Sequence, residues 1–261
     1  MNINFLFIAL SFVISTTISI KIIPLLIHNG NKYNLTDNPS PRKTHKKKIV
    51  RIGGTSILLG YLISIFITFF FLNKSLDQES INLILIITLG SIGFYLIGLI
   101  DDIFDISPFP RLSVQILFSY LIYVNGISFL KIDSNFIFAD IINLLSTILW
   151  IVGITNAMNW FDGLDGLASG VSIITISSFA LIFFVNNDYL NAWLCASLIG
   201  GIVGFLKYNF YPSRIIMGDC GSNLLGFNLA TISLFNISNN YISDINLFTN
   251  NSRLIISLLL L

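Results

Sequence analysis

The sequence predicts an all-α, polytopic membrane protein: a bundle of about nine membrane-spanning helices with its N-terminus outside the cytoplasm. Hydrophobic residues make up 54% of the 261 residues, the mean hydropathy is +0.83, and only 10% of the residues are charged. Water-soluble domains carry about 25% charged residues, so this chain has too few charges to cover a water-exposed surface. Its apolar segments lack the alternation of strands, which favours helices over a membrane barrel.

Apolar segments of about 20 residues, the length needed to cross a bilayer, recur along the chain. Eight are expected, at about 3–26, 53–72, 81–100, 112–130, 137–155, 170–186, 190–206 and 221–236, and the pattern is weakest at 112–130 and 221–236. The first has no basic residue before it and no cleavage site after it, so it predicts a retained span and not a signal peptide. A ninth begins near residue 253 and runs into the end at Leu261. We therefore expect a single integral membrane domain, 1–261, truncated at its C-terminus.

Lysine and arginine residues predict the orientation, because cytoplasmic loops are enriched in them. Seven of these residues follow the first span: Lys32, Arg42, Lys43, Lys46, Lys47, Lys48 and Arg51. If that loop is cytoplasmic, the cytoplasmic loops lie at about 27–52, 101–111, 156–169 and 207–220. They hold ten lysine and arginine residues, against two in the outer loops. The bias supports the number of spans, since one missed helix would reverse every later loop.

Acidic residues gather in the same predicted loops: Asp101, Asp102, Asp105, Asp162, Asp165 and Asp219. Clustered carboxylates repel one another unless a cation lies among them. Mg²⁺ takes oxygen ligands and often shares them with substrate phosphates, and Arg and Lys side chains bind phosphate oxygens. The pattern therefore predicts metal-assisted phosphoryl transfer at one face of the membrane.

Taken singly, these residues also fit plainer roles, such as basic residues that only orient the chain and Asp-Gly pairs that only form turns. Two functions compete with an enzyme: an ion-coupled transporter and an inactive paralogue that serves as a scaffold. Transporters usually place ionisable residues inside the spans, whereas here they lie at the ends. No Walker A motif and no dinucleotide-binding glycine pattern is present, and nothing indicates a nucleic-acid partner.

Four ordered motifs between about Asp37 and Phe227 resemble the polyprenyl-phosphate N-acetylhexosamine-1-phosphate transferases. This superfamily, glycosyltransferase family 4, contains the MraY-, WecA- and TagO-type enzymes. The motifs are Arg42, Lys43 and His45 with Gly53-Gly54; Asp101-Asp102 with Arg111 and Gln115; Asn156, Asn159, Asp162 and Asp165; and Met217-Gly218-Asp219-Cys220-Gly221-Ser222. The spacing from Asp101 to Asp105 resembles the WecA/TagO-like branch, and the MraY-type phospho-N-acetylmuramoyl-pentapeptide transferase is the alternative.

The resemblance implies transfer of a sugar 1-phosphate, GlcNAc-1-phosphate, from a UDP-sugar to a polyprenyl phosphate, with release of UMP. This reaction would begin cell-envelope glycan synthesis at the cytoplasmic face of a bacterial inner membrane. The implied cofactor is Mg²⁺, which Mn²⁺ could replace, and a homodimer is compatible with the resemblance. Family members also carry an Arg- and His-rich loop after the ninth span, beyond Leu261.

The resemblance also assigns roles to residues of this chain. The implied metal ligands are Asp219 and Asn159. The implied catalytic residues are Asp101, Asp102 and Asp162, of which the first two would position the lipid phosphate. The implied substrate-binding residues are Arg42, Lys43, His45, Arg111, Asn156 and Asp165.

Overall fold

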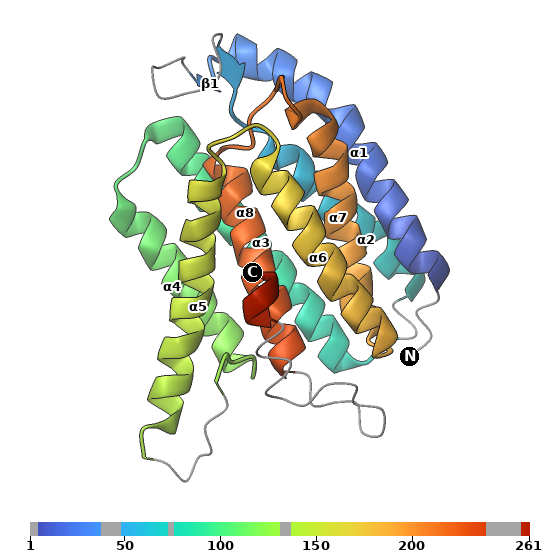
Figure 1. Ribbon diagram of the computed structural model, residues 1–261, viewed down its shortest axis with the longest axis vertical. Helices are drawn as coiled ribbons and strands as arrows, with labels where there is room; N and C mark the ends of the chain where they lie inside the picture. Colours follow the sequence, from blue (N-terminus) through green and yellow to red (C-terminus); the bar gives the residue numbers. More distant parts are fainter. Residues whose placement is uncertain (1–4, 38–47, 73–75, 131–136, 239–256) are drawn as a thin grey trace.

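The structure is a computed structural model that describes residues 5–37, 48–72, 76–130, 137–238 and 257–261 (Figure 1). Its helices are α1 (Phe5–Lys32), α2 (Gly54–Leu72), α3 (Gln78–Phe104), α4 (Pro108–Val124), α5 (Ala139–Phe161), α6 (Leu167–Val185), α7 (Tyr189–Asn209) and α8 (Gly218–Ser238). Each of them overlaps one of the eight predicted segments, so the all-helical fold is confirmed. Helix α4 ends at Val124, six residues before the predicted end of its segment. Of the predicted ninth span, which begins near residue 253, the structure describes residues 257–261, and residues 257–260 are helical.

Six of these helices, α1, α2, α3, α5, α6 and α7, are long and apolar enough to cross a membrane. Helix α4 is shorter, with 17 residues, and α8 is interrupted by polar side chains. These two correspond to the segments with the weakest apolar pattern. The described part of the chain is therefore a multi-pass membrane protein, and its helices support six spans by length and composition.

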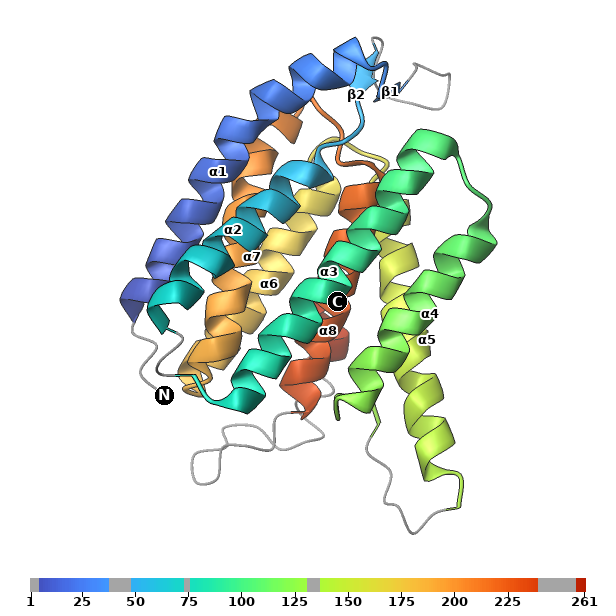
Figure 2. The same ribbon diagram turned by 180° about the vertical axis from the view of Figure 1, so that it is seen from behind.

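Helix α8 is the central helix of the bundle and packs against α2, α3, α5 and α6 (Figure 2). Its polar side chains are buried, and some of them form hydrogen bonds with neighbouring helices. The Nδ2 of Asn228 donates to Ser91 of α3 at 2.9 Å, and the indole of Trp150 in α5 donates to Ser233 at 2.8 Å. Protein surrounds this helix, so interhelical hydrogen bonds can replace the apolar composition that lipid would require.

Helices α1 and α7 pack closely through small residues. A Cβ atom at Gly200 would lie 2.4 Å from the carbonyl oxygen of Phe12, and one at Gly204 would lie 2.7 Å from Cβ of Ser19. Small residues at such positions let two membrane helices approach each other. This contact holds α1 against the rest of the bundle.

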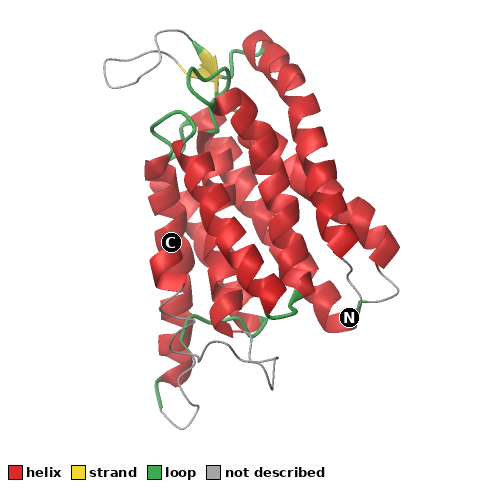
Figure 3. Cartoon of the chain, turned by 45° about the vertical axis from the view of Figure 1, so that its right-hand side comes forward, coloured by secondary structure: helices red, strands yellow, loops and turns green. Residues whose placement is uncertain are grey.

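The described parts of the four predicted cytoplasmic loops all lie at one end of the bundle, opposite the N-terminus (Figure 3). The loop after α1 forms a short antiparallel pair of strands there, β1 (Thr36–Asp37) and β2 (Ile49–Val50). The connections alternate between the two ends, as the lysine and arginine bias requires. Polar loops that are far apart in sequence therefore meet at one place.

Candidate functional site

Backbone hydrogen bonds join the end of β2 and the residues after it to the segment that precedes α8. The N–H of Ile216 donates to the carbonyl of Val50 at 2.8 Å, and the N–H of Gly53 donates to the carbonyl of Ile216 at 2.9 Å. A Cβ atom at Gly54 would lie 2.3 Å from Cα of Gly221, so only glycine permits this approach of α2 to α8. The pairing places Arg51 beside the first turn of α8.

Asp102, close to the end of α3, caps the N-terminus of α8. Its carboxylate accepts hydrogen bonds from the backbone N–H groups of Asp219 at 2.9 Å and Cys220 at 2.8 Å. The first N–H groups of a helix have no partner within the helix, and a carboxylate there also interacts favourably with the helix dipole. The side chain of Asp102 is only 1% exposed. Gly218 permits the contact, because its φ is +77° and a Cβ atom would lie 2.7 Å from Oδ2 of Asp102.

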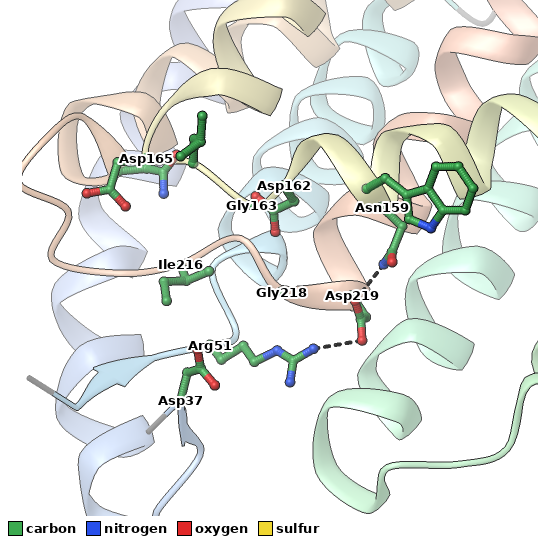
Figure 4. A pocket seen from close by; sticks show the side chains of 12 residues that line it. Asp37, Arg51, Asn159, Asp162, Gly163, Asp165, Ile216, Gly218 and Asp219 are labelled. Carbon is green, nitrogen blue, oxygen red and sulfur yellow. Dashed lines mark hydrogen bonds and ion pairs between the residues drawn. The ribbon is translucent and has the colours of Figure 1, made fainter. Parts of the chain in front are cut away.

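Asp219 lies at the centre of the polar cluster (Figure 4). Its Oδ2 accepts a hydrogen bond from Nη2 of Arg51 at 2.8 Å, and its Oδ1 accepts one from Nδ2 of Asn159 at 2.5 Å. The Nε of Arg51 lies 2.9 Å from Oδ1 of Asp102, so one guanidinium joins the two carboxylates. Burial alone would lower the pKa of Arg51, but Asp102 and Asp219 outweigh it and raise this pKa, so the guanidinium stays charged.

A pocket of about 300 Å³ opens beside Asp219. It is lined by Asp37, Arg51, Asn159, Trp160, Asp162, Gly163, Leu164, Asp165, Asn209, Ile216, Gly218 and Asp219. Asp165 lies across the pocket from Asp219 (Figure 4) and accepts a hydrogen bond from the N–H of Ser213 at 3.1 Å. Burial raises the pKa of Asp162 well above the usual range of a carboxyl group, and the charges of Asp219 and Asp102 raise it further.

The donor atoms at Asp219 suit a hard cation. The carboxylate of Asp219 and the amide of Asn159 offer oxygen atoms at the edge of the pocket. Within the described ranges, no group of three or more His, Cys, Asp or Glu side chains is arranged to share a metal ion. Mg²⁺ commonly keeps several waters and uses one or two carboxylates together with substrate phosphates. Asp219 and Asn159 therefore fit this ion, with water and a phosphorylated substrate as the other ligands.

Asp101 and Arg111 form a separate ion pair, with Nη1 of Arg111 lying 2.9 Å from Oδ2 of Asp101. The pair belongs to the α3–α4 corner of the same end of the bundle and does not line the pocket. Both side chains are partly exposed, by 12% for Asp101 and 23% for Arg111. Asp101 therefore remains more accessible than its neighbour Asp102.

Asn156 lies one helical turn before Asn159 and is part of a network of amides. Its Nδ2 donates to Oε1 of Gln115 at 3.2 Å, and Nε2 of Gln115 donates to Oδ1 of Asn223 at 3.1 Å. The Nδ2 of Asn223 in turn donates to the carbonyl of Asp219. Asn156 thus supports the site through α4 and α8 and does not line the pocket.

The structure brings four of the predicted site residues to the pocket: Asn159, Asp162, Asp165 and Asp219. Asp101, Asp102, Arg111 and Asn156 lie at the same end of the bundle but do not line the pocket. Arg42, Lys43 and His45 lie outside the described residues, so their proposed contacts stay predictions. The roles of all these residues stay predictions as well.

Arg51 is the main residue that the sequence did not single out. It looked like one basic residue among seven in its loop, and its carboxylate partners are far away in the sequence. The pair Gly53-Gly54 was the available signal, because adjacent glycines often mark a close approach of the backbone to another element. Asn209 was also missed: its Oδ1 accepts from the N–H of Gly166 at 3.1 Å, which links two loops that border the pocket.

Comparison with known proteins identifies relatives of this chain. The family model described as glycosyl transferase family 4 matches residues 84–236. A probable undecaprenyl-phosphate N-acetylglucosaminyl 1-phosphate transferase of Bacillus subtilis is 32% identical over 241 residues, which are 88% of this chain and 63% of that relative. A phospho-N-acetylmuramoyl-pentapeptide-transferase of Lactobacillus helveticus is 30% identical over 246 residues, which are 86% of this chain and 74% of that relative.

A third relative, the phospho-N-acetylmuramoyl-pentapeptide-transferase of Halalkalibacterium halodurans, is 32% identical over 248 residues, 86% of this chain and 72% of its own. The chain thus spans slightly less than two thirds of the length of the Bacillus relative and about three quarters of the length of the other two. The family model covers more than half of the chain, including Asp101, Asn159 and Asp219. The chain therefore belongs to glycosyl transferase family 4.

Proposed function

We propose that this chain transfers a sugar 1-phosphate, GlcNAc-1-phosphate, from a UDP-sugar to a polyprenyl phosphate and releases UMP. The observation that carries this proposal is the cluster of Asp219, Asn159 and Arg51 at the N-terminus of α8, beside a pocket of about 300 Å³. The cluster combines oxygen ligands for a cation with a fixed positive charge for phosphate oxygens. The name of the Bacillus relative supports the choice of sugar and of lipid.

In the proposed reaction, an oxygen of the lipid phosphate attacks the β-phosphorus of the UDP-sugar. A new bond forms between that oxygen and the β-phosphorus, and the bond from the β-phosphorus to the bridging oxygen breaks. UMP leaves with the bridging oxygen, and a polyprenyl-pyrophosphoryl-sugar remains. A phosphate is already ionised at neutral pH, so the attack needs little help from a base. Positioning and charge neutralisation supply most of the catalysis in such a transfer.

The residues of the site divide between these tasks. Mg²⁺ held by Asp219 and Asn159 would neutralise the diphosphate as negative charge shifts onto the leaving oxygen. Arg51 adds a charged donor at the same edge of the pocket. We assign the uridine contact to Asp165 and a supporting role to Asp162, both of which line the pocket.

We assign the contact with the lipid phosphate to Asp101 and Arg111. Their ion pair is partly exposed at the α3–α4 corner, where a lipid head group can approach from the bilayer. Asp102 differs, because its buried carboxylate already binds Arg51 and two N–H groups of α8. We therefore propose that Asp102 positions Asp219 and does not contact the substrate.

We infer that the site faces the cytoplasm at a bacterial inner membrane. The predicted positive-inside pattern supports this orientation. Large aromatic side chains around the site are exposed, among them Phe109, Trp160, Phe210 and Tyr211, by 79%, 86%, 68% and 73%. Aromatic residues are enriched at the level of the head groups, and such a depth would bring a soluble nucleotide and a lipid phosphate together.

A second candidate uses the same chemistry with another donor. Relatives of similar identity, from Lactobacillus and Halalkalibacterium, are phospho-N-acetylmuramoyl-pentapeptide-transferases. The donor of this chain could then be a UDP-N-acetylmuramoyl-pentapeptide.

The test supplies purified protein with undecaprenyl phosphate, Mg²⁺ and either UDP-GlcNAc or the UDP-N-acetylmuramoyl-pentapeptide. UMP and the lipid product are quantified by mass spectrometry, with an EDTA sample as the control. Metal-dependent formation of UMP and polyprenyl-pyrophosphoryl-GlcNAc in equal amounts supports the proposal. Turnover of the pentapeptide donor alone favours the second candidate, and turnover of neither contradicts both.

A further inference from the structure

Arg51 is in direct contact with a residue proposed to hold the metal ion. Its Nη2 lies 2.8 Å from Oδ2 of Asp219, and its Nε lies 2.9 Å from Oδ1 of Asp102. Asp219 also receives the Nδ2 of Asn159 on its other oxygen. A cationic side chain thus neutralises the carboxylate that a divalent cation would use.

The two carboxylates that Arg51 contacts, Asp102 and Asp219, differ in their surroundings. Asp102 is buried and is fixed by its bonds to α8, whereas Asp219 borders the pocket with a side chain that is 19% exposed. The backbone of Arg51 is held as well, because its N–H donates to the carbonyl of Leu35 at 3.1 Å. The guanidinium can therefore remain on Asp102 while its outer nitrogens turn from Asp219 to a ligand in the pocket.

From the charges, we expect Arg51 to weaken the binding of a metal ion alone and to favour the binding of a metal ion together with a diphosphate. A guanidinium bound to Oδ2 of Asp219 repels a dication at the same carboxylate. A diphosphate brings several negative charges and can bind the guanidinium and the dication at once. Its arrival would remove the repulsion and leave Asp219 free for the metal.

We propose that Arg51 couples metal binding to donor binding: it holds Asp219 and keeps the metal affinity low until a nucleoside diphosphate takes over its guanidinium. This inference rests on the proposed function, because it takes the cation and the diphosphate as ligands of this site. Arg51 then prevents a tightly bound metal from attracting phosphates other than the donor. It is a positioning residue for Asp219 before it becomes a contact of the substrate.

The experiment titrates the detergent-purified protein with Mn²⁺ and follows free Mn²⁺ by electron paramagnetic resonance, without and with UDP. We expect Arg51→Gln to bind Mn²⁺ about tenfold more tightly than the wild type without UDP, within the usual range of couplings between sites. UDP should then improve the Mn²⁺ affinity of Arg51→Gln much less than that of the wild type. Arg51→Lys keeps the positive charge and should stay close to the wild type.

The matched control is Arg111→Gln, which removes the same charge from the neighbouring ion pair without touching Asp219. Its Mn²⁺ affinity should stay within about threefold of the wild type, because the charge of Arg111 acts on the metal site only over a longer distance, where salt screens it. Thermal unfolding of every variant is recorded. If Arg51→Gln does not fold, Arg51→Leu replaces it, and we expect the same increase in Mn²⁺ affinity.

The outcomes separate this inference from the proposed function. If Asp219→Asn abolishes Mn²⁺ binding but Arg51→Gln binds no more tightly than the wild type, the metal site stands and the coupling by Arg51 is refuted. If Arg111→Gln tightens binding as much as Arg51→Gln, general charge explains the effect and the inference is also refuted. If the wild type binds no Mn²⁺ with or without UDP, the metal site fails and the inference fails with it.

Discussion

Two adjacent carboxylates, Asp101 and Asp102, are expected to respond differently to the same substitution. Asp102 accepts two backbone N–H bonds from α8 and an ion pair from Arg51, and its side chain is 1% exposed. Asp101 makes an ion pair with Arg111 in which both side chains are partly exposed. The structure therefore predicts that Asp102→Asn lowers stability and that Asp101→Asn mainly lowers activity.

The contacts give the size of the effect. Hydrogen bonds to a charged group contribute about 1.5–3 kcal/mol, and loss of a helix cap costs about 1 kcal/mol. The ion pair with Arg51 adds at most about 1 kcal/mol, because the Arg51 side chain is 31% exposed. The amide of Asn keeps one acceptor, so we expect Asp102→Asn to lower the free energy of unfolding by about 3 kcal/mol. A partly exposed pair contributes at most about 1 kcal/mol, which sets the limit for Asp101→Asn. For a chain of this size 1 kcal/mol corresponds to about 2–4 °C, so the unfolding midpoints should differ by several degrees.

A thiol-reactive fluorescent dye provides the assay, because Cys195 and Cys220 are both fully buried and react only after the protein opens. Labelling of Asp102→Asn should begin at a lower temperature than labelling of the wild type or of Asp101→Asn. UMP release by Asp101→Asn should fall although its midpoint is retained. Equal midpoints for the two variants would refute the assignment of Asp102 to the helix cap.

Three further predictions concern the surroundings of the site. Gly54→Ala should lower the free energy of unfolding by about 1–3 kcal/mol, because its Cβ would lie 2.3 Å from the backbone of α8. The control is Gly153→Ala, whose Cβ would meet no neighbouring atom within 4 Å. Equal losses of stability in the two variants would contradict the reasoning. In EDTA, the free energy of unfolding should fall as the pH rises from about 4 through the raised pKa of Asp162, because the folded protein binds more protons than the unfolded one in this range. Asp162→Asn should make the free energy of unfolding depend less steeply on pH. An unchanged pH dependence in this variant would contradict the role of Asp162. Gln115→Leu should lower the free energy of unfolding by about 1–3 kcal/mol, because Asn156 and Asn223 each lose one hydrogen bond. An unchanged unfolding midpoint would show that the network does not stabilise the helix contacts.

The helices could be predicted because lipid restricts the solutions. A segment of about 20 apolar residues in a bilayer must satisfy its own backbone, which leaves the helix as the solution. The alternation of loops between the two ends followed from the same segments and from the lysine and arginine residues. Helix α8 gave a weak signal because Asn223, Asn228 and Asn236 are buried among other helices and not in lipid.

The detailed contacts of the site could not be predicted in the same way. Arg51 and Asp219 are 168 residues apart, and no local pattern indicates which of the basic residues pairs with which carboxylate. Asn156 and Asn159 have the spacing of one helix face, yet only Asn159 reaches Asp219. The neighbours Asp101 and Asp102 carry the same charge, and only the approach of α8 distinguishes their roles.

The central claim is that the carboxylate of Asp219 at the start of α8 supports sugar-1-phosphate transfer through its charge. The most direct measurement compares UMP release by the wild type and by Asp219→Asn at saturating Mg²⁺, UDP-GlcNAc and undecaprenyl phosphate, with the unfolding midpoint of each. We expect the variant to be about 10²–10³-fold slower, as is typical when one electrostatic contact to the reacting groups is lost, with a midpoint within a few degrees of the wild type. A folded Asp219→Asn variant that releases UMP within about threefold of the wild-type rate would contradict the claim.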